Sequence, residues 1–149
     1  MLEWKPVSSH LMRARLRRRH TITLIQCYTS TNDREHPEKD TFYQQLQAEV
    51  DTVPCHDLTI VMGDLNTKFG SDNVYCDRAF GKHGCGTRNE NGERLIDFCN
   101  MNTLVIGGTL FPHQDTHKLT WCLPNGRDKN QVDHLMIEWY QWYMDMFAA

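Results

Sequence analysis

Hydrophobic and polar residues follow each other along the chain in patterns that predict both strands and helices. Ser8–Leu16 and Thr21–Tyr28 flank an arginine-rich turn, and the second segment alternates in part, which predicts two strands joined by a hairpin. Asp57–Gly63 contains a short continuous apolar run, which is typical of a strand buried on both faces. Three further short strands are predicted at Thr103–Gly107, Lys118–Cys122 and Gln131–Ile137.

Two other segments show the spacing of amphipathic helices. Asp40 is the expected N-cap of the first, and Glu93–Met101 forms the second, with Asn91 as its expected cap. Residues 70–92 between them are rich in Gly, Asn and Asp and are predicted to be mainly loop. Strands interleaved with helices predict an α/β layered fold. The apolar residues that recur at helical spacing after Asp40 are Phe42, Tyr43, Leu46 and Val50.

Length and composition indicate one globular domain. The chain has 149 residues, of which 40% are hydrophobic and 23% charged, enough to bury a substantial core. No apolar run approaches the ~18 residues of a membrane span, and residues 1–6 lack the apolar segment of a secretory signal. We therefore expect an intracellular protein, in the nucleus or cytoplasm and not secreted, without a membrane partner and with its six cysteines as thiols.

Charge is distributed unevenly along the chain. The net charge is −3, yet residues 1–20 hold six Lys or Arg and only one acidic residue. Arg17, Arg18 and Arg19 in the hairpin turn are candidates for contact with a phosphate backbone, although such a run also suits a solvated turn. Because the rest of the chain is acidic, charge alone does not indicate a nucleic-acid-binding protein.

The clearest candidate for chemistry is Gly63-Asp64-Leu65-Asn66, which directly follows the buried strand. An ionised Asp can bind a hard cation or orient a water molecule, while Asn offers a donor and an acceptor without charge. This pair suits phosphoester hydrolysis, in which a water is positioned and oxyanion charge is stabilised. The same residue types also form ordinary turns, so the tetrapeptide needs support from other positions.

Three other positions provide that support. Tyr28 ends a predicted strand, where its hydroxyl would donate to a phosphate oxygen or its ring would close the core. Thr120 and Trp121 form either a packing pair or contacts to a sugar or base. Asp133 lies in an apolar strand and is expected to need a metal, a histidine or an arginine beside it, because burying an unpaired carboxylate is costly.

Taken in order, these blocks resemble the endonuclease/exonuclease/phosphatase superfamily, and within it the endonuclease domain of non-LTR (LINE-type) retrotransposons and the craniofacial development protein 2-like sequences. The resemblance covers roughly residues 8–138 as one incomplete domain, with residues 139–149 as a divergent tail. The blocks that carry it are Gln26-Cys27-Tyr28, Asn32-Asp33, Lys39-Asp40-Thr41-Phe42-Tyr43, Gly63-Asp64-Leu65-Asn66, Gly81-Lys82-His83-Gly84, Asn89-Glu90-Asn91-Gly92-Glu93-Arg94-Leu95, Thr109-Leu110-Phe111-Pro112-His113, His117-Lys118-Leu119-Thr120-Trp121 and Asn130-Gln131-Val132-Asp133-His134.

The resemblance implies a DNase I-like fold and a reaction. The fold is a partial four-layer α/β sandwich, with two β-sheets face to face and helices outside. The reaction is hydrolysis of a DNA phosphodiester with Mg²⁺ or Mn²⁺. By the resemblance, Asp64 orients or deprotonates the attacking water and Tyr28 hydrogen-bonds the scissile phosphate. Asp64, Asn66 and Asp133 form the implied metal site, and Thr120 gives secondary support next to Trp121.

Two parts of the family pattern are not matched. The family has an active-site Asn and a metal-binding Glu on its first strands, and nothing before Tyr28 corresponds to them. Its terminal Ser-Asp-His block is not found after Asp133-His134. We therefore expect a domain cut at both ends, with little or no nuclease activity, because losing one member of a catalytic unit removes most of its rate enhancement. Missing strands also predict self-association through exposed sheet edges and apolar faces.

Other functions fit individual features less well. A non-catalytic module that binds nucleic acid or protein through the basic hairpin is the main alternative, and a phosphatase of the same superfamily is another. A zinc site built from Cys85, His113, His117 and Cys122 is disfavoured because the sequence has no Cys-x₂-Cys pair. The glycines between Gly81 and Gly86 lack the Lys-Ser/Thr of a phosphate-binding loop.

Overall fold

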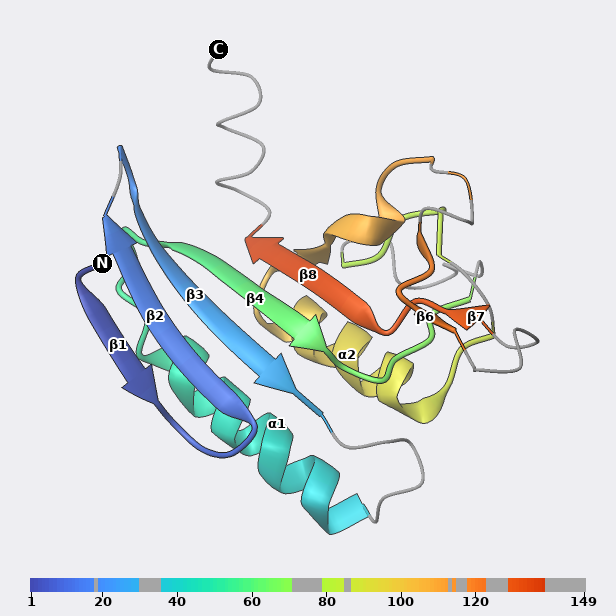
Figure 1. Ribbon diagram of the computed structural model, residues 1–149, viewed down its shortest axis with the longest axis horizontal. Coiled ribbons are helices and arrows are strands. Elements are labelled where there is room, and N and C mark those ends of the chain that lie inside the picture. The colour runs from blue at the N-terminus through green and yellow to red at the C-terminus, as the bar shows by residue number, and fades with distance from the viewer. Residues whose placement is uncertain are drawn as a thin grey trace.

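The computed structural model describes residues 1–17, 19–29, 36–70, 79–84, 87–112, 114, 118–122 and 129–138, and Figure 1 shows how their helices and strands are arranged. Six strands form one mixed sheet in the spatial order β1-β2-β3-β4-β8-β5. They are β1 (Glu3–Pro6), β2 (Leu11–Arg17), β3 (Thr21–Tyr28), β4 (Leu58–Asp64), β5 (Leu104–Ile106) and β8 (Asp133–Glu138). The strands β6 (Trp121–Cys122) and β7 (Lys129–Asn130) pair with each other as a separate ribbon.

The predicted hairpin forms the first half of the sheet. β2 pairs with β3 in antiparallel register from Arg17 opposite Thr21 to Leu11 opposite Cys27, which confirms the two strands on either side of the arginine turn. β1 extends this unit as an edge strand that the sequence analysis missed. All four β1 residues are exposed, so the alternation of buried and polar positions that marks a strand is absent there.

The second half of the sheet is built around β4, as the apolar run predicted. β3 and β4 run parallel and are connected through helix α1 (His36–Asp51), while β8 pairs antiparallel with both β4 and β5. The strand predicted at 118–122 is limited to Trp121–Cys122, and the one predicted at 131–137 begins at Asp133. A short 3₁₀ helix, η1 (Gly107–Thr109), follows β5.

Both predicted helices are present, but both predicted caps are wrong. α1 begins at His36, so Asp40 lies within the helix, where its carboxylate pairs with Arg94. Helix α2 (Glu90–Met101) begins earlier than expected, with Asn89 as its N-cap. The Asn89 side chain accepts a hydrogen bond of 2.8 Å from the Gly92 N–H, whereas Asn91 is buried in the first helical turn. A cap is identified by such a bond, which spacing alone does not reveal.

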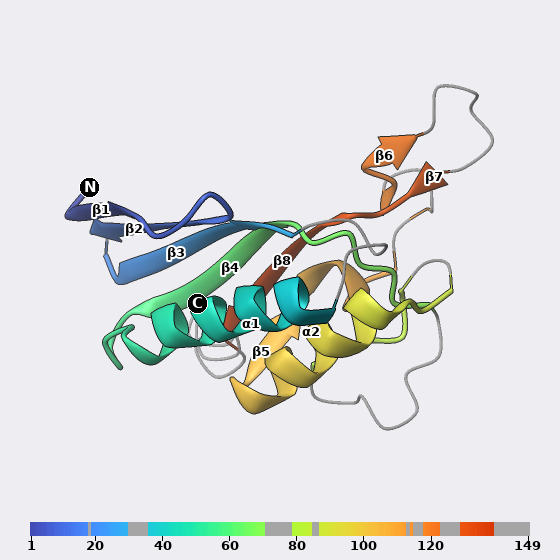
Figure 2. The same cartoon turned by 90° about the horizontal axis from the view of Figure 1, so that it is seen from below.

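Helices α1 and α2 lie on the same face of the sheet (Figure 2). Alternate residues of β2, β3, β4 and β8 point to this face and form the core with the helices. The main core side chains from the strands are Leu11, Ile25, Cys27, Val61 and Met136, and those from the helices are Phe42, Leu46, Leu95, Ile96, Phe98 and Cys99.

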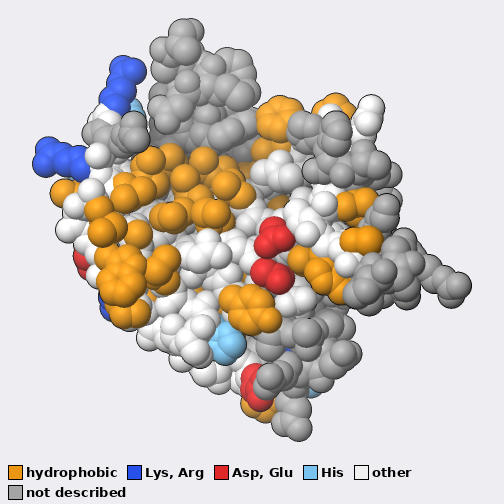
Figure 3. Space-filling model, in the orientation of Figure 1, with side chains coloured by type: hydrophobic (Ala, Val, Ile, Leu, Met, Phe, Trp, Pro, Cys, Tyr) orange, Lys and Arg blue, Asp and Glu red, His pale blue; other side chains and the backbone are white. Residues whose placement is uncertain are grey.

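The opposite face of the sheet, here called the open face, is not covered by either helix (Figures 1 and 2). Only the β6–β7 ribbon rises on this side among the described elements (Figure 2). The strand registers assign to this face the apolar residues Trp4, Met12, Leu16, Ile22, Leu24, Ile60, Met62, Leu135 and Ile137. Figure 3 shows hydrophobic side chains gathered over these strands.

The mixed α/β class is therefore confirmed, and the described residues form one six-stranded sheet with two helices. A second sheet packed against the open face is not seen among the described residues. Cys27, Cys55, Cys99 and Cys122 are free thiols. Within the described part of the chain, no helix has the length and apolar character that crossing a membrane requires.

Candidate active site

Three of the residues singled out from the sequence stand side by side at one end of the sheet. Tyr28 is the register partner of Asp64 across the parallel pair β3–β4, and Asp64 is the partner of Asp133 across the antiparallel pair β4–β8. Register partners share a face, so all three side chains project from the open face. Figure 3 shows two adjacent acidic side chains on this face, next to an exposed hydrophobic ring.

The backbone around Asp64 explains why glycine precedes it and asparagine follows it. Gly63 has a φ of +146°, and a Cβ atom there would lie 1.8 Å from the carbonyl oxygen of Cys27, so only glycine fits. Asn66 has a φ of +46°, in the left-handed region that asparagine tolerates well. Its backbone N–H donates to Asp64 Oδ1 at 3.0 Å, which closes the turn and fixes the carboxylate.

The Asn66 side chain is already engaged on one side. Its Nδ2 donates to the carbonyl oxygen of Thr29 at 2.9 Å, so the amide bridges the two segments that leave β3 and β4. The structure thus brings Asn66 close to Asp64 and to the end of β3, as the sequence predicted. The Nδ2 group of Asn66 is used to hold the two segments together. The Oδ1 atom is therefore the part of the side chain that could face a ligand.

Burial and charge both disfavour ionisation of Asp64. Its pKa is raised above the ordinary value, chiefly because the carboxylate is partly desolvated and secondly because of the Asp133 charge. The hydrogen bond from the Asn66 N–H acts in the opposite direction. Asp133 is the first residue of β8, so its expected place in a strand is confirmed, but its side chain is exposed, so the expectation that it is buried is wrong. The two carboxylates make this end of the sheet a local centre of negative charge.

Thr120 holds the strand that carries Asp133. Its Oγ1 accepts hydrogen bonds from the backbone N–H groups of Val132 at 3.1 Å and Asp133 at 3.2 Å. Trp121 follows on β6, where it is 43% exposed and pairs with Asn130 of β7. Thr120 is therefore placed to position Asp133, and Trp121 stands on the ribbon that rises beside the open face (Figure 2).

The loop after Asp64 is fastened to the start of helix α2. Asn89 Oδ1 accepts from the N–H of Lys68 at 3.0 Å, and Asn89 Nδ2 donates to the carbonyl of Asn66 at 3.1 Å. Asn91 Nδ2 adds a second bond to the same carbonyl at 3.4 Å. Neither asparagine was predicted to have a role in the site, although both belong to the Asn89–Leu95 block that carries the resemblance.

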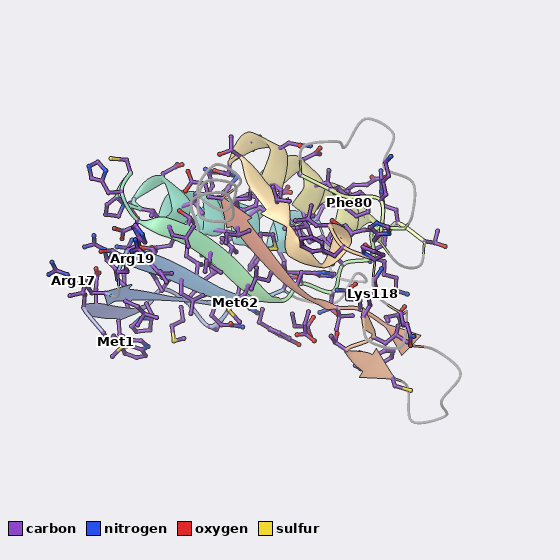
Figure 4. The ribbon with its side chains drawn as sticks, turned by 90° about the horizontal axis from the view of Figure 1, so that it is seen from above. Met1, Arg17, Arg19, Met62, Phe80 and Lys118 are labelled. Atoms are coloured by element: carbon purple, nitrogen blue, oxygen red, sulfur yellow. The ribbon has the colours of Figure 1, made fainter. Side chains whose placement is uncertain are left out.

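The basic hairpin is not part of this site. β3 runs from Thr21 to Tyr28, so at ~3.3 Å per residue the hairpin lies about 23 Å from the acidic pair. Figure 4 shows Arg17 and Arg19 at one end of the molecule and Lys118, close in sequence to Thr120, toward the other. Both arginines are exposed, while Arg18 lies outside the described residues. Any phosphate contact by the hairpin would belong to a separate surface.

His10 is a neighbour of the site that the sequence analysis missed. The Tyr28 N–H donates to the carbonyl of His10 at 2.9 Å, and the two rings stack at a centroid distance of 6.1 Å and an interplanar angle of 7°. The signal was present in the predicted hairpin. With Arg17 opposite Thr21, counting back along both strands places His10 opposite Tyr28.

The donor set suits a hard cation only in part. Two carboxylates on neighbouring strands match the one or two that typically hold Mg²⁺, whose remaining ligands are waters and substrate phosphate oxygens. Among the described residues, no group of three or more His, Cys, Asp or Glu is close enough to hold a metal without such additional ligands. Of the alternative zinc ligands, Cys85, His113 and His117 lie outside the described residues.

Comparison with known proteins shows a homologous relation. The chain is 38% identical over 115 residues to craniofacial development protein 2 of Tragulus javanicus and of Bos taurus, and the match covers 77% of this chain. It covers 20% and 19% of those proteins, so the chain spans about a fifth of the length of the curated relatives it matches. No family model matches the chain.

Proposed function

We propose that this chain carries a metal-dependent phosphodiester-hydrolysing site of the DNA endonuclease type. The proposal depends on one observation above all. Tyr28, Asp64 and Asp133 lie in register on three neighbouring strands of the sheet and share one face. Homology to craniofacial development protein 2 and the resemblance of the ordered blocks support the same class. DNA is the substrate that the resemblance implies.

The side chains divide the chemistry in a simple way. Asp64 and Asp133 would hold Mg²⁺ or Mn²⁺ with Asn66 at the edge of the shell, and the ion would neutralise charge on the phosphate. Asp64 is also placed to orient a water, and its raised pKa makes it a stronger base than an ordinary aspartate. Tyr28 is 51% exposed beside Asp64, where its hydroxyl would donate to a phosphate oxygen.

We infer that these 149 residues, tested by themselves, turn over slowly. The resemblance calls for an additional metal-binding Glu and a terminal His, and neither has a counterpart in this sequence. Two carboxylates alone bind a divalent cation weakly, and a missing acid or electrostatic group commonly costs several orders of magnitude in rate. Binding of metal and DNA is therefore a better measure of this site than cleavage.

The proposed function is tested by metal binding and by cleavage in parallel. Mn²⁺ binding is measured by electron paramagnetic resonance for the wild type, for D64N and D133N, and for D97N as a control on helix α2. We expect the first two variants to lose the ion and D97N to keep it. Nicking of supercoiled plasmid with Mg²⁺ should be close to background and absent in D64A. Metal binding that is equal in all variants would contradict the proposal.

We further propose that the open face is where a second sheet would pack in a complete four-layer sandwich. This face is apolar along β2, β3, β4 and β8, which is the character of an inner sheet face rather than of a solvated one. The same apolar surface predicts self-association of this chain when nothing else covers it.

A second candidate function is nucleic-acid binding by the hairpin without catalysis. Arg17 and Arg19 are exposed and separate from the acidic pair, so they would attract a phosphate backbone without the repulsion of Asp64 and Asp133. This function needs neither metal nor an intact site.

A further inference from the structure

The row of side chains at the end of the sheet has a fourth member. His10 lies opposite Tyr28, which lies opposite Asp64, which lies opposite Asp133. The four residues thus belong to four adjacent chain segments and stand in a line across the open face.

The ring of His10 has a defined orientation and tautomer. Its Nδ1 lies 3.0 Å from the carbonyl oxygen of Tyr28. A carbonyl oxygen can only accept, so Nδ1 carries the hydrogen and Nε2 is the nitrogen that gains or loses the second proton. Parallel stacking on Tyr28 further restricts the ring. The chain therefore presents an exposed imidazole in a defined orientation beside the tyrosine of the site.

A role as a third metal ligand does not fit the distances. Neighbouring strands are about 4.8 Å apart, so His10 and Asp64 are separated by about 10 Å and His10 and Asp133 by about 14 Å. The described residues accordingly contain no group of three His, Cys, Asp or Glu able to hold one ion. The separation from Asp64 also exceeds two hydrogen bonds of about 3 Å to one phosphate oxygen.

We propose that His10 binds the phosphate that neighbours the one held at Asp64 and Asp133 in a nucleic-acid strand lying along the row. This inference rests on the proposed function and adds a residue that sets the path of the substrate. A protonated imidazole donates from Nε2 to a phosphate oxygen and supplies positive charge at an otherwise acidic end of the sheet. Of the titratable groups in the row, Tyr28 contacts His10, and Asp64 lies one strand further along.

The test is the affinity for a fluorescent single-stranded oligonucleotide in Mg²⁺ at about pH 6 and about pH 8, between which histidine changes charge. We expect H10Q to weaken binding about threefold to fivefold at the lower pH, the range of an exposed charge pair, and to have little effect at the higher pH. H10R should restore tight binding at both pH values. H56Q, at another exposed histidine, should behave as the wild type.

The same measurement separates this inference from the proposed function. Mg²⁺ should strengthen binding in the wild type and in H10Q, and not in D64N. If H10Q equals the wild type at both pH values while D64N loses the Mg²⁺ effect, the role of His10 is wrong and the metal site stands. If H10Q weakens binding at the lower pH while Mg²⁺ strengthens the binding of D64N as much as that of the wild type, His10 binds phosphate and the hydrolase proposal is wrong. Binding that neither variant changes, or no binding, overturns both.

Discussion

Asp64 lies directly opposite Asp133 in the antiparallel pairing of β4 with β8, on the face of the sheet that the helices leave open. Two like charges in this position repel each other, and the raised pKa of Asp64 is in part a consequence. Proteins keep such pairs where a cation or a substrate needs them. We therefore expect that removing one of the two carboxylates raises the stability of the fold and weakens metal binding.

Replacing one of these carboxylates should stabilise the fold. D133N removes the repulsion and keeps the shape of the side chain, so we expect the free energy of unfolding in urea to rise by about 0.5 kcal/mol without added metal. Mg²⁺ should raise the melting temperature of the wild type and leave that of D133N unchanged. If the free energy of unfolding of D133N is instead lower than that of the wild type by more than about 1 kcal/mol, Asp133 has a structural role.

A second prediction concerns Thr120 as a positioning residue. T120V removes the oxygen that accepts from the N–H groups of Val132 and Asp133, while keeping the volume of the side chain. We expect the binding free energy for Mn²⁺ to become less favourable by about 1 kcal/mol, which is the contribution of an ordinary hydrogen bond. T120S retains the hydroxyl and should retain the affinity. Equal affinity in T120V and T120S would show that the strand holds Asp133 without this residue.

The sequence predicted the framework of this site better than its details. The apolar run 57–63 and the arginine turn were sufficient to place β4 and the β2–β3 hairpin, because both are strong local patterns. Strand order is not a local property, so the pairing of Asp64 with Asp133 required the structure. The role of Asn89 and the exposure of Asp133 likewise depend on contacts between distant segments.

The burial of His134 predicts that the fold loses stability in mild acid. Burial lowers its pKa to about 4, whereas an unfolded histidine titrates near 6.5. Between these values the unfolded chain binds the proton more readily, so stability is complete above about pH 6.5 and decreases as the pH falls toward 4. H134F keeps a ring beside Phe69 but loses the hydrogen bond to the Thr67 carbonyl, so it should lower the overall stability and flatten this part of the pH profile.

The control for this prediction is H56Q at an exposed position, whose profile should follow the wild type. The measurement is urea unfolding at a series of pH values. A profile for H134F that is as steep as the wild type between about pH 6.5 and pH 4 would assign the acid sensitivity to other groups.

The basic hairpin predicts a salt effect that is independent of metal. If Arg17 and Arg19 each contact a phosphate, then replacing both with alanine should reduce the slope of log affinity against log salt by about 1.8 for duplex DNA. The measurement is fluorescence anisotropy in EDTA over a range of salt. A slope that does not change in R17A/R19A would remove the hairpin from DNA binding and leave the acidic site as the remaining candidate surface.

Self-association should depend on the open face rather than on the helices. Trp4 is 56% exposed on β1 and Leu135 is 42% exposed on β8, and apolar strands lie between them. Burying such a surface against a second molecule gains about 25 cal/mol for each Å² removed from water, so we expect dimers or larger species in sedimentation experiments.

W4K/L135E should shift the chain toward monomer by placing charges on this face. M101K, at a side chain 74% exposed on α2, should leave the distribution unchanged. A wild-type chain that sediments as one monomeric species would show that the apolar face is already covered within the molecule, and a shift caused equally by M101K would place the contact on the helices.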